Sequence, residues 1–258
     1  MEFIRACDDL AGGVRDAVAG MVGTPEAGEY VRMGADGTPT KKIDQVAEDI
    51  VVDYFTCHPF CRHLISEELG CARMGGEKGT IYLDPVDGTH NAVVGIPFYA
   101  LSIAYAEEGV VQAGYVQNLA TGETFHAIRG QGACLDRHPI HVSRTSLLEE
   151  SAMSIYGRKF DPTRMFGIAR KIRRLRLLGA SALELCYVGC GRLDGFVDVR
   201  GTLRVTDAAA GMLICEEAGG TVSDPEGNTL IFPDEVSAGR SLVATNSVVH
   251  NKVIEYLR

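Results

Sequence analysis

The 258-residue sequence predicts two halves of different fold class, an α+β half followed by an α/β half. In the first half, two helical segments precede three strand-like segments joined by short turns, which favours an antiparallel meander. In the second half, strand-like and helical segments alternate, which favours a mixed, partly parallel sheet with helices on its faces. We therefore expect two domains, 1–148 and 149–258.

The first half begins with two predicted helices. Apolar residues recur with a helical period over 2–22, and a turn signal at 23–25 ends that segment. After a polar loop at 34–40, a second helical period begins at Gln45. Asp44 therefore lies at a helix start, where a carboxylate can cap free N–H groups.

Strands are predicted from residue 64 onward. Leu64–Glu68 has the pattern of a short strand that ends in two acids, whose side chains would point to opposite faces. Residues 70–79 are predicted to form a loop. We expect the next strand, Ile81–Leu83, to stop at Pro85, because proline has no N–H to offer a sheet. The predicted meander then comprises residues 100–107, 110–118 and 123–128.

In the second half, predicted strands and helices alternate along the chain. The predicted order is strand 152–156, helix 163–171, strand 175–178, helix 181–190, strand 196–199, helix 207–218 and strands 221–223 and 241–245. This alternation is typical of crossover connections between parallel strands.

The composition excludes several classes of protein. A formal net charge of −9 argues against general nucleic-acid binding, which depends on basic surface. No apolar run reaches membrane-spanning length, and charged residues interrupt the first twenty positions, so we expect neither a membrane span nor a signal peptide. These features predict a cytoplasmic protein.

The central motif of the sequence is Ile81–Asn91, which reads I-Y-L-D-P-V-D-G-T-H-N. Two carboxylates, Asp84 and Asp87, flank the expected strand end, and such a pair can share a divalent cation. The N–H groups of Gly88 and Thr89, where a helix could begin, would suit a phosphate. The alternative is an ordinary turn punctuated by Asp and Gly.

Several motifs decide between these interpretations. Five acids stand at the ends of predicted elements, namely Asp44, Glu67, Asp84, Asp87 and Asp207. The motifs S-E-E at 66–68, D-P-V-D-G-T at 84–89 and T-D-A-A-A-G…E-A-G-G at 206–220 resemble those of the inositol monophosphatase family. With G-A-D-G-T-P-T-K-K-I-D at 34–44, the chain is most similar to the archaeal inositol monophosphatase/fructose-1,6-bisphosphatase branch.

The resemblance implies a layered α-β-α-β-α sandwich of the sugar-phosphatase type and a lithium-sensitive, Mg²⁺-dependent phosphomonoesterase that acts on a small phosphorylated metabolite. One Mg²⁺ would be held by Glu67, Asp84 and the carbonyl of Val86, and a second by Asp84, Asp87 and Asp207. A third, weaker ion would use Glu67, and Mn²⁺ could replace Mg²⁺. Asp44 and Thr89 would activate the attacking water. Relatives are usually homodimers.

The chemistry supports this assignment independently. Hydrolysis of phosphate monoesters is among the slowest uncatalysed reactions, and two metal ions can both activate water and stabilise the leaving oxygen. Mg²⁺ favours a few carboxylates together with water and phosphate oxygens. The sequence departs from many relatives at Thr206, where a Trp is usual, and at Ala92, where an aromatic residue is usual.

Substrate choice is expected to depend on the second half. By resemblance, the substrate contacts would be Asp87, Gly88, Thr89, Arg176, Ser181 and Arg200. The guanidinium of Arg176 suits a second phosphate. The alternative is that Arg176 belongs to a solvated basic segment with the Arg and Lys residues at 170–174.

Other functions remain open. The segment Cys186–Arg192 satisfies the C-x₅-R pattern of cysteine phosphatases, but Cys186 falls inside a predicted buried helix. The eight cysteines are predicted to be reduced and mostly buried. Within the same fold, a 3′(2′),5′-bisphosphate nucleotidase or an NADP phosphatase is the alternative enzyme. A phosphometabolite sensor or partner-binding module is the alternative without catalysis.

Overall fold

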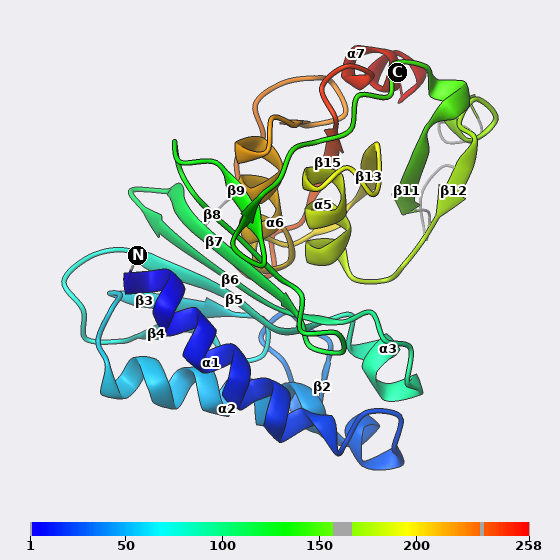
Figure 1. Cartoon of the computed structure of the whole chain (residues 1–258). Coiled ribbons are helices and arrows are strands. Elements are labelled where there is room, and N and C mark those ends of the chain that lie inside the picture. The colour runs from blue at the N-terminus through cyan, green and yellow to red at the C-terminus, as the bar shows by residue number, and fades with distance from the viewer. Residues whose placement is uncertain (1, 157–166, 233–234, 258) are drawn as a thin grey trace.

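The computed structural model describes residues 2–156, 167–232 and 235–257 (Figure 1). The longer helices of this part of the chain are α1 (Glu2–Ala19), α2 (Lys42–Cys57), α5 (Ser181–Gly189), α6 (Val205–Glu217) and α7 (His250–Leu257). Helices α1 and α2 cover one face of an eight-stranded sheet, while α5 and α6 lie between this sheet and a second sheet, whose far face packs on α7. The predicted α-β-α-β-α sandwich is confirmed.

The first sheet has the strand order β10-β9-β8-β7-β6-β5-β3-β4. Its strands are β3 (His63–Ser66), β4 (Gly70–Arg73), β5 (Thr80–Asp87), β6 (Ala100–Glu107), β7 (Val110–Asn118), β8 (Thr124–Ile128), β9 (Ala133–Leu135) and β10 (His138–Pro139). All neighbours are antiparallel except β3 and β5, which run parallel and so end at the same edge. The predicted meander is confirmed as β6, β7 and β8.

The second sheet has the order β12-β11-β13-β15-β14. Its strands are β11 (Ala152–Tyr156), β12 (Arg174–Arg176), β13 (Gly195–Leu203), β14 (Thr221–Ser223) and β15 (Arg240–Thr245). Strand β11 is parallel to both of its neighbours, whereas β15 is antiparallel to β13 and β14. The predicted mixed, partly parallel sheet is confirmed.

The apolar residues of each layer follow from its secondary-structure period. On α1, the buried residues Phe3, Cys7, Leu10, Val14 and Val18 recur every three or four positions, which gives one stripe facing the sheet. On β13, neighbouring residues face opposite sides of the sheet, so that one side packs on α5 and α6 and the other on α7.

Helix α6 is buried on almost all sides because it is enclosed by two sheets and α5. At Gly114 of β7, a Cβ atom would lie 2.8 Å from the carbonyl oxygen of Ala210. At Gly211, a Cβ would lie 2.7 Å from the Cβ of Leu185 on α5. Glycine at these two positions therefore allows the close approach of α6 to its neighbours.

Smaller elements complete the first half. Strands β1 (Tyr30–Met33) and β2 (Pro39–Lys41) form a hairpin, a 3₁₀ turn spans Pro25–Gly28 and the short helix α3 spans Thr89–Val94. A second 3₁₀ turn, Leu148–Glu150, leads into the second half. In the described part of the chain, no helix is both long and apolar enough to cross a membrane.

The structure corrects the prediction that a strand ends at Pro85. Strand β5 continues to Asp87, and its register against β6 shifts between Asp84 and Asp87. Pro85 and Val86 lie in this irregularity, opposite Leu101 alone, so the missing N–H of proline leaves no ladder hydrogen bond unmade.

Other differences concern short elements. Part of the predicted loop 70–79 is strand β4, and helix α7 was not predicted. The predicted helix 163–171 begins among residues outside the described part of the chain. The division into domains near residue 148 stays a prediction, and one apolar core combines Phe125 from the first half with Leu213 from the second.

Candidate active site

Three of the predicted metal ligands meet at one edge of the first sheet. Glu67, Asp84 and Asp207 each offer a carboxylate oxygen, and these oxygens all lie within 4.8 Å of one another. Glu67 follows β3 and Asp84 lies on β5, so the parallel pairing of these strands brings them together. Asp207 comes from the first turn of α6 in the other half. These hard oxygen donors could hold a metal ion.

Asp87 lies beside this cluster and binds the start of α5. Its Oδ1 accepts a hydrogen bond of 3.0 Å from the N–H of Ser181, and its Oδ2 accepts one of 2.7 Å from the N–H of Ala182. A carboxylate at this position satisfies free N–H groups and interacts favourably with the helix dipole. Asp87 therefore joins β5 to the second half, and its predicted role as a metal ligand stays a prediction.

Asp44 and Thr89 form the hydrogen-bonded pair that the sequence motifs predicted to activate water. The Thr89 hydroxyl lies 2.9 Å from Asp44 Oδ1 and 3.0 Å from the carbonyl oxygen of Val86, and can donate to either. The other Asp44 oxygen accepts a 3.3 Å hydrogen bond from the N–H of Lys41, so Asp44 also caps α2. Gly88 precedes Thr89 with φ of 86°, where a Cβ would lie 3.0 Å from the carbonyl oxygen of Phe98.

Burial and mutual repulsion dominate the electrostatics of the site. Burial is the largest cause of the raised pKa values of Glu67, Asp84 and Asp87. Neighbouring carboxylates raise these pKa values further, with Asp207 acting on all three. A group of acids in this state is stabilised by any cation that binds among them.

One such cation belongs to the chain itself. Arg204, three residues before Asp207, donates from Nη2 to Asp207 Oδ1 at 2.9 Å and from Nη1 to Glu67 Oε1 at 2.6 Å. Its Nη1 also forms an ion pair with Asp36 of the β1–β2 turn. Sequence reasoning missed Arg204 and Asp36; the available signals were the R-x-x-D spacing at the start of α6 and the acid within the motif at 34–44.

The substrate-contacting residues predicted in the second half differ in burial and in their hydrogen-bonding partners. Ser181 is buried beside Asp87. Arg200 forms an ion pair of 2.6 Å with Asp198 and stacks on Tyr156, with its guanidinium carbon 4.5 Å from the ring centroid. Arg176 is exposed at the end of β12, where its guanidinium donates to the carbonyl of Leu175. The structure thus brings Ser181 to the site and directs Arg176 toward solvent.

The cysteine-phosphatase interpretation does not fit the structure. Cys186 is buried within α5, and burial raises the pKa of its thiol well above the usual range, which opposes formation of a thiolate nucleophile. All eight cysteines are free, as predicted. The prediction that they are mostly buried is wrong for Cys57 and Cys71, which are exposed, and Cys134 and Cys190 are half-buried.

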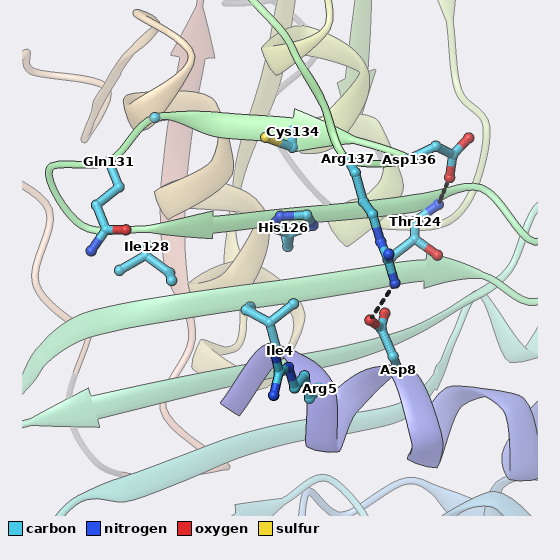
Figure 2. A pocket seen from close by; sticks show the side chains of 11 residues that line it. Ile4, Arg5, Asp8, Thr124, His126, Ile128, Gln131, Cys134, Asp136 and Arg137 are labelled. Atoms are coloured by element: carbon cyan, nitrogen blue, oxygen red, sulfur yellow. Dashed lines mark hydrogen bonds and ion pairs between the residues drawn. The ribbon is translucent and has the colours of Figure 1, made fainter. Parts of the chain in front are cut away.

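A separate groove of about 630 Å³ lies between α1 and strands β8 and β9 (Figure 2). Arg137 spans its mouth and forms a 3.7 Å ion pair with Asp8, while Asp136 accepts a hydrogen bond from the N–H of Thr124. None of the predicted site residues lines this groove. The acidic cluster is therefore the candidate active site.

A family model described as the inositol monophosphatase family matches residues 9–258. The chain belongs to the inositol monophosphatase family. A fructose-1,6-bisphosphatase/inositol-1-monophosphatase of Methanothermobacter thermautotrophicus is 44% identical over 264 residues, which cover 96% of this chain and 94% of that protein. A bifunctional NADP phosphatase/NAD kinase of Methanococcus maripaludis is 35% identical over 98% of this chain, which spans only 49% of that relative.

Solved structures of the inositol monophosphatase family agree with this fold. A Pyrococcus horikoshii protein, described as having similarities to inositol-1 monophosphatase, superposes with a TM-score of 0.86 at 29% identity, covering 99% of this chain and 96% of that one. The resemblance that the sequence motifs indicated is confirmed at the level of the family and its archaeal branch.

At this candidate active site, the carboxyl group of Asp44 leads to a prediction for the pH dependence of stability. Burial raises the pKa of Asp44 from its usual value near 3.8 to about 7, although the hydrogen bond from Thr89 opposes the shift. Between these values the folded state holds a proton that the unfolded state has lost, so the contribution of Asp44 to stability is lost as the pH rises from about 4 to about 7 and is constant at higher pH. The full effect is about 4 kcal/mol.

We expect Asp44→Asn to reduce the loss of stability between about pH 4 and about pH 8, measured by urea unfolding in excess EDTA. The neighbouring acids with raised pKa values change stability in the same direction, so the comparison between variant and wild type isolates the contribution of Asp44. An equal pH dependence in the two proteins would contradict the assigned pKa.

Proposed function

We propose that the chain is a Mg²⁺-dependent phosphomonoesterase that hydrolyses fructose 1,6-bisphosphate, inositol 1-phosphate or both by means of metal-activated water. The observation that carries this proposal is the cluster of Glu67, Asp84 and Asp207, with carboxylate oxygens within 4.8 Å of one another. The Asp44–Thr89 hydrogen bond beside it supports a hydrolase over a sensor, because a protein that only binds phosphate needs no pair to accept a proton from water.

The donor set fits Mg²⁺. The cluster contains only oxygen donors, and its acids, of which Asp84 and Asp207 are buried and Glu67 is half-buried, carry an excess of negative charge. Bound ions would supply a nucleophilic hydroxide and stabilise charge on the phosphate. Glu67, Asp84, Asp207 and the carbonyl of Val86 would hold them, with Asp87 beside them. We propose two ions, a weaker third ion at Glu67, and Mn²⁺ as an alternative.

The chain's own proton path begins at Thr89. When its hydroxyl donates to Asp44 Oδ1, the lone pairs of Thr89 Oγ1 are free to accept a hydrogen bond from the attacking water. Ionised Asp44 can take up the proton that passes through Thr89 as the water attacks phosphorus. The N–H groups of Gly88 and Thr89 are proposed to bind phosphate oxygens, and Ser181 and Arg200 to contact the rest of the substrate.

A substrate panel measured by phosphate release tests this function. The panel contains fructose 1,6-bisphosphate, inositol 1-phosphate, adenosine 3′,5′-bisphosphate and NADP. Each substrate is assayed with Mg²⁺, with excess EDTA, and with protein that has been treated with a thiol alkylator. We expect turnover of the first two substrates, loss of activity in EDTA, and retention of activity after alkylation. Activity that survives EDTA would reject the metal mechanism.

NADP phosphatase is the second candidate function. It is favoured by the 35% identity to a bifunctional NADP phosphatase/NAD kinase over 98% of this chain. The same metal cluster would serve both reactions, since only the group that carries the phosphate differs. A higher kcat/KM for NADP than for the sugar and polyol phosphates would favour this candidate.

Arg176→Ala is expected to raise KM for fructose 1,6-bisphosphate about tenfold, with a smaller effect on inositol 1-phosphate. Although Arg176 is exposed at the end of β12, its guanidinium suits a second phosphate, which only the bisphosphate carries. Steady-state kinetics on both substrates measures the difference. Arg173→Ala, which removes another exposed cation from the same segment, is the matched control. Equal effects of both variants would assign Arg176 to the solvated surface.

We also propose a homodimer located in the cytoplasm. Leu175 and Leu177, at and just beyond the edge strand β12, are 50% and 61% exposed, and a second copy could cover them. Light scattering of the full chain measures the oligomeric state. A monomer at micromolar concentration would reject the proposed homodimer.

A further inference from the structure

We infer that Arg204 competes with metal ions for Glu67 and Asp207, so that a cation enters the cluster in exchange for the guanidinium. This inference rests on the proposed function, because it concerns the affinity of the same site. Arg204 would then set the metal concentration that the reaction requires.

The guanidinium of Arg204 occupies carboxylates that a metal would use. Its Nη1 lies 2.6 Å from Glu67 Oε1, and its Nη2 lies 2.9 Å from Asp207 Oδ1. Its Nε donates to the second oxygen of Asp207 at 3.1 Å. Arg204 therefore binds two of the three members of the cluster, and both oxygens of Asp207 are engaged.

The guanidinium of Arg204 and the two carboxylates that it contacts are largely shielded from solvent. Arg204 is 21% exposed in its side chain, and the carboxylates it contacts are 13% exposed at Glu67 and 11% exposed at Asp207. A charge at this depth is poorly screened by salt, so its electrostatic effect on a cation entering the cluster is strong. A metal ion and a guanidinium on the same oxygens would also repel each other.

Arg204 also has a partner outside the cluster, which it can keep when a metal binds. Asp36, on the β1–β2 turn, forms an ion pair with Nη1 and has a side chain only 1% exposed. The N–H of Asp36 donates to the carbonyl of Glu67 at 3.2 Å, which fixes the turn beside the cluster. When a cation takes Glu67 and Asp207, the guanidinium can remain on Asp36 and is not left buried without a counter-charge.

If Arg204 had a purely structural role, its removal would change metal affinity in the opposite direction. If Arg204 served only to hold Glu67 and Asp207 in the geometry that a metal needs, its removal would disorder the ligands and weaken metal binding. If it competes, its removal leaves the cluster more negative and strengthens metal binding. The direction of the change in affinity therefore distinguishes the two roles.

The test compares wild type, Arg204→Met and Arg204→Lys as full chains. Binding of Mn²⁺ is measured from the electron paramagnetic resonance signal of the free ion, and binding of Mg²⁺ by calorimetry. We expect the dissociation constants of Arg204→Met to fall about tenfold. Arg204→Lys keeps the charge but loses the planar fork, and we expect a smaller fall of about threefold.

Arg192→Met is the matched control, because Arg192 forms a comparable ion pair with Glu123 and contacts no member of the cluster. Its dissociation constants should equal those of the wild type. The rise in Tm caused by saturating Mg²⁺ should be larger for Arg204→Met than for the wild type, because a tighter ligand stabilises the folded state more.

The possible results separate the inference from the function on which it rests. Unchanged or weaker metal binding by folded Arg204→Met overturns the competition. If Arg204→Met does not fold, Arg204→Lys decides by the same criterion. A wild-type chain that binds neither Mn²⁺ nor Mg²⁺ rejects the proposed metal enzyme instead, before any variant is compared.

Discussion

Asp84→Asn is expected to lower kcat by at least about 1,000-fold and to weaken Mg²⁺ binding. Asp84 is 2% exposed, and the negative charges of Glu67, Asp87 and Asp207 all act on its carboxylate. An amide has nearly the same shape but carries no charge, and it offers one oxygen in place of two. Phosphate release at saturating substrate and Mg²⁺ concentrations measures the loss.

Two comparisons make the Asp84→Asn result specific. Asp53→Asn changes an exposed acid on α2 in the same way and should keep wild-type kcat. The stability of the metal-free Asp84→Asn protein should be equal to or greater than that of the wild type, because one repelling carboxylate has been removed. Wild-type turnover by Asp84→Asn in saturating Mg²⁺ would show that the cluster is not the active site.

Thr89→Val is expected to lower kcat about 100-fold while KM and Mg²⁺ affinity change little. Valine matches threonine in shape but removes the hydroxyl that lies within hydrogen-bonding distance of Asp44 and the Val86 carbonyl. The effect should therefore appear in the chemical step, since substrate and metal contacts are retained. Single-turnover phosphate release, together with Mn²⁺ binding, separates these contributions.

Thr89→Ser supplies the complementary control. Serine restores the hydroxyl without the methyl group, so most of the activity should return. If Thr89→Val and Thr89→Ser lost the same amount of activity, packing at the start of α3 would explain the loss, and the proposed proton path would be wrong.

The layers of the fold could be predicted because apolar residues recur with a clear helix or strand period along the long elements. The meander β6–β8 was recognisable from its alternating residues and short turns. Short elements gave too few residues for a period, which is why β4 and α7 were missed. The extension of β5 was missed because a bulge places Pro85 where no ladder hydrogen bond is required.

The site was predictable to the extent that its residues stand at the ends of elements. Glu67 and Asp84 were recognised as candidates from the acids near the ends of two predicted strands, whereas the parallel pairing that brings them together came from the structure. Asp207 comes from the other half, and only the family resemblance connected it to them. Arg204 could not be identified in the same way, because its importance depends on Asp36 and Glu67, which are far from it along the chain.

The close contact between Gly114 and α6 limits which residue position 114 can hold. Main-chain atoms of β7 and α6 meet there directly, so the height of the helix above the sheet is fixed by the backbone. Ala210, which makes this contact, lies one turn from Asp207, so the same contact sets how far Asp207 stands from Asp84. A side chain at residue 114 would therefore have to move α6, and Asp207 with it, relative to Asp84, even though residue 114 touches no carboxylate.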